Sequence, residues 1–358
     1  MPGAATMGQD FTMYVGTVGG GLAVSSDSGA TFQHLGMRGT LPPSECDVRA
    51  VTVYPDNPDR VLAGTNAGVY RSENRGQSWE LLDSQMNTEW PARSHRTSDQ
   101  WPLQNIEIWS VTVDPIDTQT IFVGARPGVF RSKDDGRTWE ELPLNVRMDG
   151  PIGTPRTTIV LVDPRDHQTV WAGTEVDAVY RSANGGDSWT RMPEVGPQRM
   201  AGDIHGLAIK SGDPATMFCT TPHGFSTSTD DGASWDLHEF PKFHEPDWKP
   251  GDGSAYCRTI FMKPDNPDVM LVGTGNTIPG DIGAIRRSCD GGKTWEAPKL
   301  PVTPNSVLYG FGSHALIPDT IVAHTVNGYL YLSDNGGESW RKLSKEFGHI
   351  RAVAVSPN

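Results

Sequence analysis

Short runs of alternating apolar and polar residues recur along the chain, and each run ends at turn-forming residues. Residues 49–54, RAVTVY, alternate and stop at PDNPD, where proline and aspartate cannot continue a strand. The signals RVLAGT, GVYRS and, after a tight turn, SWELL follow. Counterparts of the first run are WSVTVDP, TIVLVDP, HGLAIKS, RTIFMKP and GSHALIP. Four short antiparallel strands with little helix signal predict one blade of an all-β propeller.

The pattern repeats with a period that indicates a ring. The motif S-x-[DN]-x-G-x-[ST]-[WF] begins at Ser25, Ser72, Ser132, Ser182, Ser228, Ser288 and Ser333. Steps in the forties, with two longer steps of 60 residues, are typical of a repeat architecture with long loops at two places. The chain opens on strands two to four of the pattern and ends on a first strand, HIRAVAVSPN. We therefore predict a single seven-bladed propeller domain over 1–358, whose first blade combines 11–36 with 348–358.

The seven motifs resemble Asp-boxes, also called BNR repeats. Such repeats occur in sialidases, two-domain xyloglucanases, sortilin-type receptors and the plant photosystem II assembly factor. The resemblance covers nearly the whole chain and implies that the motif forms the turn between the third and fourth strands, away from the ligand face. The short Asp or Asn side chain can accept backbone N–H groups there, and the glycine two residues later can adopt a positive φ. These motifs are therefore expected to hold the fold, because the relatives that share them do unrelated things.

Composition narrows the choice of partner. The formal charge of −13 disfavours nucleic acid and anionic membrane as main partners. No apolar stretch is long enough to span a bilayer, and MPGAATMGQDFT lacks the basic and apolar regions of a secretory signal, so the expected location is cytoplasmic. Four scattered cysteines without a C-x-x-C pair fit buried thiols in a reducing compartment.

Function is expected where the repeats differ at the channel mouth. The start of the inner strand carries, blade by blade, Arg49, Trp109, Thr158, His205, Arg258, Gly312 and Arg351. Guanidinium groups recognise carboxylate or phosphate, so Arg49, Arg258 and Arg351 predict a site for a small anionic substrate or ligand. The alternative is that each arginine pairs with a nearby acid such as Asp47, Asp203 or Glu107.

The end of the second strand offers a second set of candidates. Glycine fills this position in five blades, whereas Cys219 and His324 replace it in two. His205 and His324, with Glu175 or Asp177 as oxygen partners, are candidate acid–base residues, and such a set could also ligate a divalent metal. Further candidate substrate-binding residues are Trp109, Arg126, His223 and Tyr256.

Two long loops, 83–107 and 236–256, are rich in aromatic residues and are expected to form walls of the mouth or a surface for a protein partner. The sequence thus favours an intracellular hydrolase or lyase acting on a small anionic molecule. A non-catalytic binding or assembly scaffold and a glycoside hydrolase remain as alternatives. Sialidase is disfavoured, because the seven-blade count and the missing Arg-Ile-Pro motif do not resemble that family.

Overall fold

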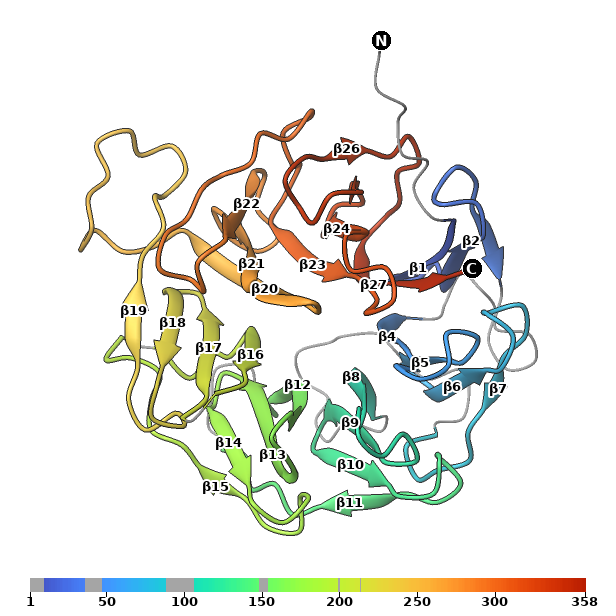
Figure 1. The fold of residues 1–358 in the computed structure, drawn as a ribbon. Coiled ribbons are helices and arrows are strands. Elements are labelled where there is room, and N and C mark those ends of the chain that lie inside the picture. Colours follow the sequence, from blue (N-terminus) through green and yellow to red (C-terminus); the bar gives the residue numbers. More distant parts are fainter. Residues whose placement is uncertain (1–9, 36–46, 88–105, 148–153, 199, 213) are drawn as a thin grey trace, which may run out of the picture.

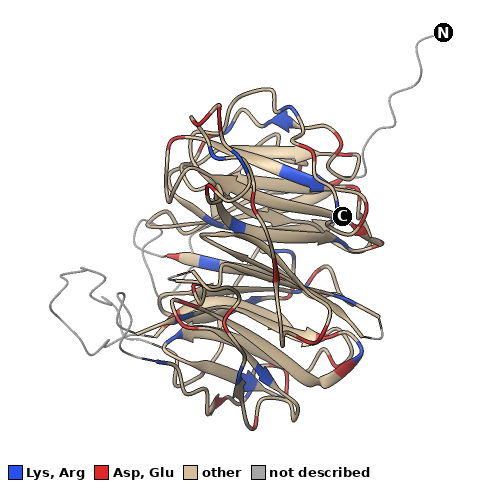
Figure 2. Cartoon of the chain, turned by 90° about the vertical axis from the view of Figure 1, so that its left-hand side faces the viewer, with Lys and Arg blue, Asp and Glu red and all other residues tan. Residues whose placement is uncertain are grey.

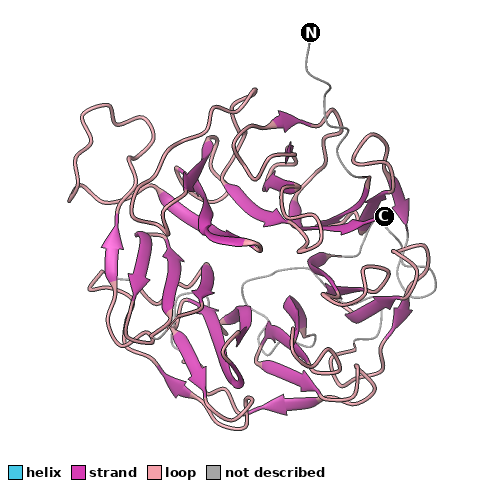
Figure 3. Ribbon diagram, viewed as in Figure 1, coloured by secondary structure: helices cyan, strands magenta, loops and turns pink. Residues whose placement is uncertain are grey.

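The computed structural model describes residues 10–35, 47–87, 106–147, 154–198, 200–212 and 214–358. All regular structure in these ranges is β-strand, and Figure 3 shows strands and loops alone. Within them, no helix is long and apolar enough to cross a membrane. The strands form seven antiparallel sheets arranged as blades around a central axis, as the sequence predicts (Figure 1).

Each blade runs from an inner to an outer strand. Blade 1 consists of β27 (Ile350–Pro357), β1 (Phe11–Thr17), β2 (Leu22–Ser25) and β3 (Gln33–Leu35). Blades 2 and 3 consist of β4 (Val48–Val53), β5 (Val61–Thr65), β6 (Gly68–Ser72), β7 (Glu80–Leu81), β8 (Glu107–Val113), β9 (Ile121–Arg126), β10 (Val129–Ser132) and β11 (Glu140–Leu142). Blades 4 and 5 consist of β12 (Arg156–Asp163), β13 (Asp166–Glu175), β14 (Val179–Ser182), β15 (Thr190–Arg191), β16 (Gly206–Lys210), β17 (Thr216–Thr221), β18 (Gly224–Ser228) and β19 (Asp236–His238). Blades 6 and 7 consist of β20 (Tyr256–Lys263), β21 (Asn266–Gly275), β22 (Gly283–Ser288), β23 (Leu308–Gly312), β24 (Ile321–Thr325), β25 (Leu330–Ser333) and β26 (Arg341–Lys342).

Blade 6 differs slightly from the other six. Its sheet has three strands, and a single bridge between Arg287 and Glu296 stands where the fourth strand would be.

The two ends of the chain close the ring. β27 pairs antiparallel with β1, from Phe11 opposite Pro357 to Thr17 opposite Ile350. Asn358 adds hydrogen bonds to the Asp10 carbonyl and the Thr12 hydroxyl. The inner strand of the first blade therefore comes from the last residues of the sequence, as predicted, and this pairing leaves no open sheet edge at the closure.

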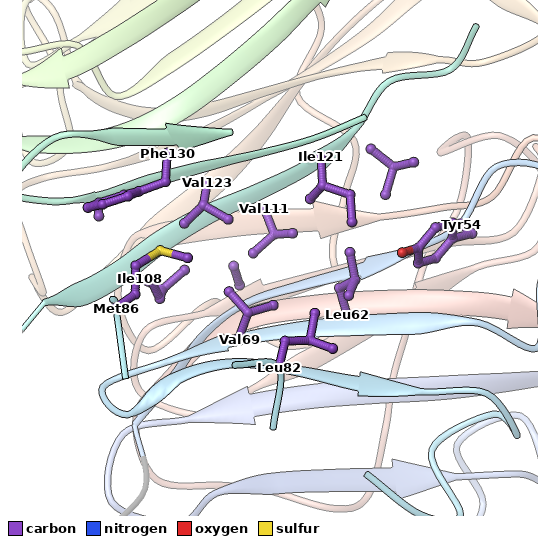
Figure 4. Packing of buried hydrophobic residues seen from close by; sticks show 13 residues of the cluster. Tyr54, Leu62, Val69, Leu82, Met86, Ile108, Val111, Ile121, Val123 and Phe130 are labelled. Atoms are coloured by element: carbon purple, nitrogen blue, oxygen red, sulfur yellow. The ribbon is translucent and has the colours of Figure 1, made fainter. Parts of the chain in front are cut away.

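The core lies between neighbouring blades. In the cluster shown in Figure 4, Leu62 and Val69 of blade 2 pack against Val111 and Phe130 of blade 3. Each interface of this kind has its own buried cluster, so the sheets are joined face to face by apolar side chains.

The repeated motif forms a self-contained turn. In the third blade, the buried Ser132 hydroxyl donates to Asp134 and accepts the N–H of Gly136, and Asp134 accepts the N–H of Thr138. Gly136 has φ of 78°, and Trp139 donates its Nε1–H to the Gly136 carbonyl. Hydrogen bonds from Thr138 and Ser132 lower the pKa of Asp134 to about 2. The motif thus serves the turn, as its composition predicts.

Candidate functional site

A β-bulge near the start of the inner strand aims one side chain of most blades at the channel mouth. The pairing register shifts at this point in six blades, beside Arg49, Trp109, Thr158, Arg258, Tyr309 and Arg351. In blade 5, His205 precedes β16, and its N–H bonds to the Thr220 carbonyl. A bulge inserts an extra residue and re-aims its side chain. These seven residues, with Ile159 and Thr259, line one cavity of about 170 Å³.

Glycines on the second strands allow the bulges to approach. A Cβ on Gly124 would lie 2.3 Å from the Thr157 carbonyl oxygen of the next blade, and one on Gly273 would lie 2.4 Å from that of Leu308. Any larger residue would push the neighbouring inner strand away.

The predicted inner strand of blade 7 is wrong. Its inner strand is β23, so the segment GSHALIP is not the inner strand. The bulge residue is Tyr309, and Gly312, which the repeat alignment placed at this position, lies at the end of β23. The bulge spoils the alternation in VLYGFG, and this is why the apolar pattern misplaced the strand.

In the first half of the mouth, formed by blades 2 to 4, two guanidinium groups lie over the indole ring of Trp109. The Cζ atoms of Arg49 and Arg156 lie 4.6 Å and 4.7 Å from the Trp109 ring centroid. The Arg49 guanidinium is also 2.6 Å from an oxygen of Asp47 and 3.5 Å from Glu107. Of the two alternatives for the arginines, an anionic ligand or a nearby acid of the protein, Arg49 therefore follows the second.

Glu175 joins the two halves of the mouth. Its carboxylate is buried and accepts hydrogen bonds from Arg156 at 2.7 Å and from Arg258 at 2.6 Å. Burial raises its pKa, but Arg258 and Arg156 outweigh burial and hold the pKa at about 2. Glu175 is thus a permanent anion, which is unsuited to donate a proton near neutral pH.

Tyr309 lies between two guanidinium groups in the second half. Its ring centroid is 4.3 Å from Cζ of Arg258 and 4.9 Å from Cζ of Arg351. Its hydroxyl accepts a hydrogen bond from Arg258 at 2.7 Å. Burial would raise the pKa of Tyr309, but Arg258 and Arg351 outweigh it and lower the pKa below the ordinary value.

Arg351 differs from the other two arginines of the predicted set. In the described part of the chain, no carboxylate lies within ion-pair distance of its guanidinium, which lies over the Tyr309 ring instead. Its Nε atom is buried and has no hydrogen-bond partner among the described residues. Arg351 also lowers the pKa of Arg49, after the larger effect of burial, which indicates that the two cations lie close together.

The histidines occupy different environments. His205 lines the mouth, where its Nδ1 donates to the Cys257 carbonyl at 2.7 Å and its Nε2 is 3.3 Å from both Asp203 and the Tyr256 hydroxyl. His324 is buried behind Tyr309, with ring centroids 5.8 Å apart, and does not line the cavity. Burial lowers the pKa of His324 to about 3, so its ring is neutral. The structure does not bring the two rings together in the mouth.

Asp177 lies outside the mouth, in a second hollow of about 480 Å³. Its buried carboxylate accepts hydrogen bonds from the Tyr180 hydroxyl at 2.5 Å and the Arg147 N–H at 3.0 Å. This hollow, which we call the outer hollow, is lined by Arg147, Val176, Asp177, Arg191, Glu194, Gly196, Pro197, Gln198, Met200, Ala201, Gly202 and Asp203.

Other candidates do not line the mouth. Arg126 is buried and donates from Nε to the Thr154 carbonyl, and the His223 N–H donates to Thr221 in the turn after β17. Most of the loop 83–107 lies outside the described residues. The loop 236–256 extends along the outer rim of blades 5 and 6 (Figure 1), where Phe240 packs on Trp295. None of its residues lines the mouth, so the aromatic wall expected from this loop is wrong.

A metal is not favoured by the side chains at the site. Among the residues that the structure describes, no three His, Cys, Asp or Glu side chains converge into a ligand set. Acidic and basic residues are both spread along the ribbon in the side view of Figure 2.

The sequence pattern missed Tyr309 and Arg156. Arg156 stands directly opposite Glu175 in the β12–β13 pairing, so a cross-strand register would have found it. Tyr309 was hidden by the misplaced inner strand of blade 7.

Known proteins resemble this chain at low identity, and no family model matches it. A probable oligoxyloglucan-reducing end-specific xyloglucanase of Neosartorya fischeri is 27% identical over 355 residues, covering 94% of this chain and 38% of that protein. The photosystem II assembly lipoprotein Ycf48 of a Synechococcus strain is 22% identical over 290 residues, covering 80% of this chain and 72% of that protein. The solved GH74 xyloglucanase from Xanthomonas campestris superposes with a TM-score of 0.63 at 17% identity, covering 97% of this chain and 52% of that one.

These likenesses correct the predicted function and support the fold. The chain spans about two fifths of the length of the first of these xyloglucanases. The similar proteins are named for xyloglucan cleavage or for photosystem assembly, so the expectation of an intracellular hydrolase or lyase for a small anionic molecule is wrong. The chain is a seven-bladed propeller that resembles xyloglucanases and Ycf48.

Proposed function

We propose that this propeller is a non-catalytic binding protein whose channel mouth receives a carboxylate group of its ligand. The supporting observation is Arg351, a half-buried guanidinium on the mouth with no carboxylate partner among the described residues. An uncompensated cation in a partly desolvated site favours an incoming anion, and the planar fork of arginine suits a carboxylate.

The other charged groups of the mouth support binding over catalysis. Glu175 is held as an anion by two arginines, and Asp47 is held by Arg49. Acid–base catalysis needs a carboxyl whose pKa is raised toward neutrality, and the pKa of Glu175 is shifted the other way. Trp109 and Tyr309, the aromatic rings of the mouth, each already have two guanidinium groups within 4.9 Å of the ring centroid.

The test is a titration with simple carboxylates. Acetate, succinate and D-glucuronate should bind to the whole chain in calorimetry, and Arg351→Gln should weaken that binding about 30-fold or more. Arg341→Gln, which changes an exposed arginine paired with Asp334 on blade 7, is the matched control and should have no effect. Equal affinities for the wild type and Arg351→Gln would show that the mouth does not receive the carboxylate.

A glycoside hydrolase is the second candidate, and one observation favours it. The similarity to a probable xyloglucanase covers 94% of this chain and 38% of that protein. At the mouth, Glu107 and Asp203 have side chains that are 20% and 13% exposed, so their oxygens reach solvent. Release of reducing ends from xyloglucan that disappears in Asp203→Asn would favour this candidate over a binding role.

A further inference from the structure

The outer hollow adjoins the mouth. Asp203 lines the hollow, and its Oδ2 is 3.3 Å from Nε2 of His205, which lines the mouth. Its Oδ1 accepts the N–H of Val176 at 3.1 Å. One carboxylate therefore forms the wall between the two cavities, and a ligand of more than one unit can contact both.

The hollow has the size and the backbone strain of a binding site. Its volume of about 480 Å³ lies within the roughly 300–1,000 Å³ range of small-molecule sites. Val176, on its wall, has φ of 65°, a conformation that a β-branched residue rarely adopts. The hydrogen bond to Asp203 holds this strained residue in place, and strain of this kind gathers at ligand sites.

The wall of the hollow carries charged side chains of both signs. Asp177 is bonded to Tyr180 and lies 3.4 Å from Nε of Arg191, and Arg191 also donates to Glu194 at 2.8 Å. Arg147 also lines the hollow, and its guanidinium forms no ion pair with the described residues. Carboxylate oxygens retain lone pairs for hydroxyl donors, and a guanidinium retains N–H donors for hydroxyl acceptors. Val176, Pro197 and Ala201 add apolar contact for C–H groups.

We infer that the ligand is an acidic oligosaccharide, with a uronate carboxylate at Arg351 in the mouth and a neighbouring sugar ring in the outer hollow. This inference rests on the proposed function, because it needs the carboxylate site. An acidic peptide is the competing ligand, and the experiment below separates the two.

The experiment compares two trimers of equal net charge with a single acidic sugar and a neutral trisaccharide. Calorimetry would measure galacturonate, trigalacturonate, triglutamate and maltotriose against the whole chain. Trigalacturonate should bind at least about tenfold more tightly than galacturonate or triglutamate, and maltotriose should bind more weakly than any carboxylate. Glu194→Trp fills the hollow from an exposed position and should weaken trigalacturonate about tenfold.

Glu338→Trp is the matched control, because Glu338 is another exposed glutamate facing an arginine and lies outside both cavities. It should leave the affinity for trigalacturonate unchanged, and equal melting temperatures of the two variants would show that both fold. Triglutamate binding as tightly as trigalacturonate would overturn the sugar in favour of a polypeptide. Trigalacturonate binding no tighter than galacturonate would exclude the hollow. In both cases Arg351-dependent binding would leave the proposed function standing, whereas loss of all carboxylate binding would overturn both proposals.

Discussion

The seven outer turns and the seven mouth positions share one repeat but follow opposite rules. In each turn the motif's Ser and Asp or Asn side chains close their hydrogen bonds within eight residues, as Ser132 and Asp134 do with Gly136 and Thr138 in blade 3. At the mouth, partners come from different blades, as when Arg258 meets Glu175 across 83 positions of sequence. Residue types can stay the same in every blade where each copy makes its side-chain hydrogen bonds with its own turn. They differ between blades at the mouth, where side chains of different blades contact one another.

The largest expected effect concerns the carboxylate that joins two blades of the mouth. Glu175→Gln should lower the free energy of unfolding by roughly 3–5 kcal/mol, because the buried Arg258 and the partly buried Arg156 would lose their full counter-charge. Urea denaturation of the two proteins measures this. Asp334→Asn, at an exposed pair with Arg341, is the control and should cost less than about 1 kcal/mol.

The same carboxylate predicts a dependence on pH. Its pKa is about 2 in the folded chain and near 4.5 ordinarily, so its contribution is complete above about pH 4.5 and is lost as the pH falls toward 2. The difference in stability between the wild type and Glu175→Gln should therefore shrink by about 3 kcal/mol over this range. The contrary outcome is that the wild type and Glu175→Gln differ in stability by the same amount at every pH, or by no more than the exposed-pair control differs from the wild type. Either result would show that the ion pairs of the mouth do not stabilise the fold more than surface ion pairs do.

The contrast between the two regions also explains what the sequence could predict. The period, the ring closure by 350–357 and the inner-strand positions of Arg49, Trp109 and Arg258 follow from local patterns. The contacts between side chains of different blades at the mouth cannot be predicted in this way, because they do not follow the sequence repeat. The bulge in β23 hid Tyr309.

His324 and Asp177 show why the predicted acid–base set did not form. The repeat places both residues near the end of a second strand, but it does not show whether a side chain reaches the cavity or is buried behind it. His324 lies behind Tyr309, against Gly310 of the same blade. Asp177 projects into the outer hollow, two residues beyond Glu175. β13 ends at Glu175, and Val176, with φ of 65°, turns the chain before Asp177, so the alternation that would place the two acids on one face does not continue.

A smaller effect is expected where the second strand of blade 3 approaches the inner strand of blade 4. Gly124→Ala should cost roughly 1–3 kcal/mol, because the new methyl group meets a backbone oxygen that cannot move aside easily. Gly348→Ala is the control, since a Cβ there has no neighbour within 4 Å. Denaturant midpoints compare the two. If both variants are equally stable, the close approach between blades 3 and 4 does not require glycine.

The smallest effect is expected at an outer turn. Ser132→Ala removes a buried hydroxyl that accepts the Gly136 N–H and donates to Asp134, so it should cost about 1 kcal/mol. Its six counterparts remain, and each of them is satisfied within its own turn. Binding of D-glucuronate per folded molecule should be unchanged, because none of the turn residues lines either cavity. Calorimetry at a temperature where both proteins are folded separates stability from affinity. A loss of affinity at equal folded fraction would mean that the outer turns act on the mouth, and the division between a self-satisfied scaffold and a variable binding face would fail.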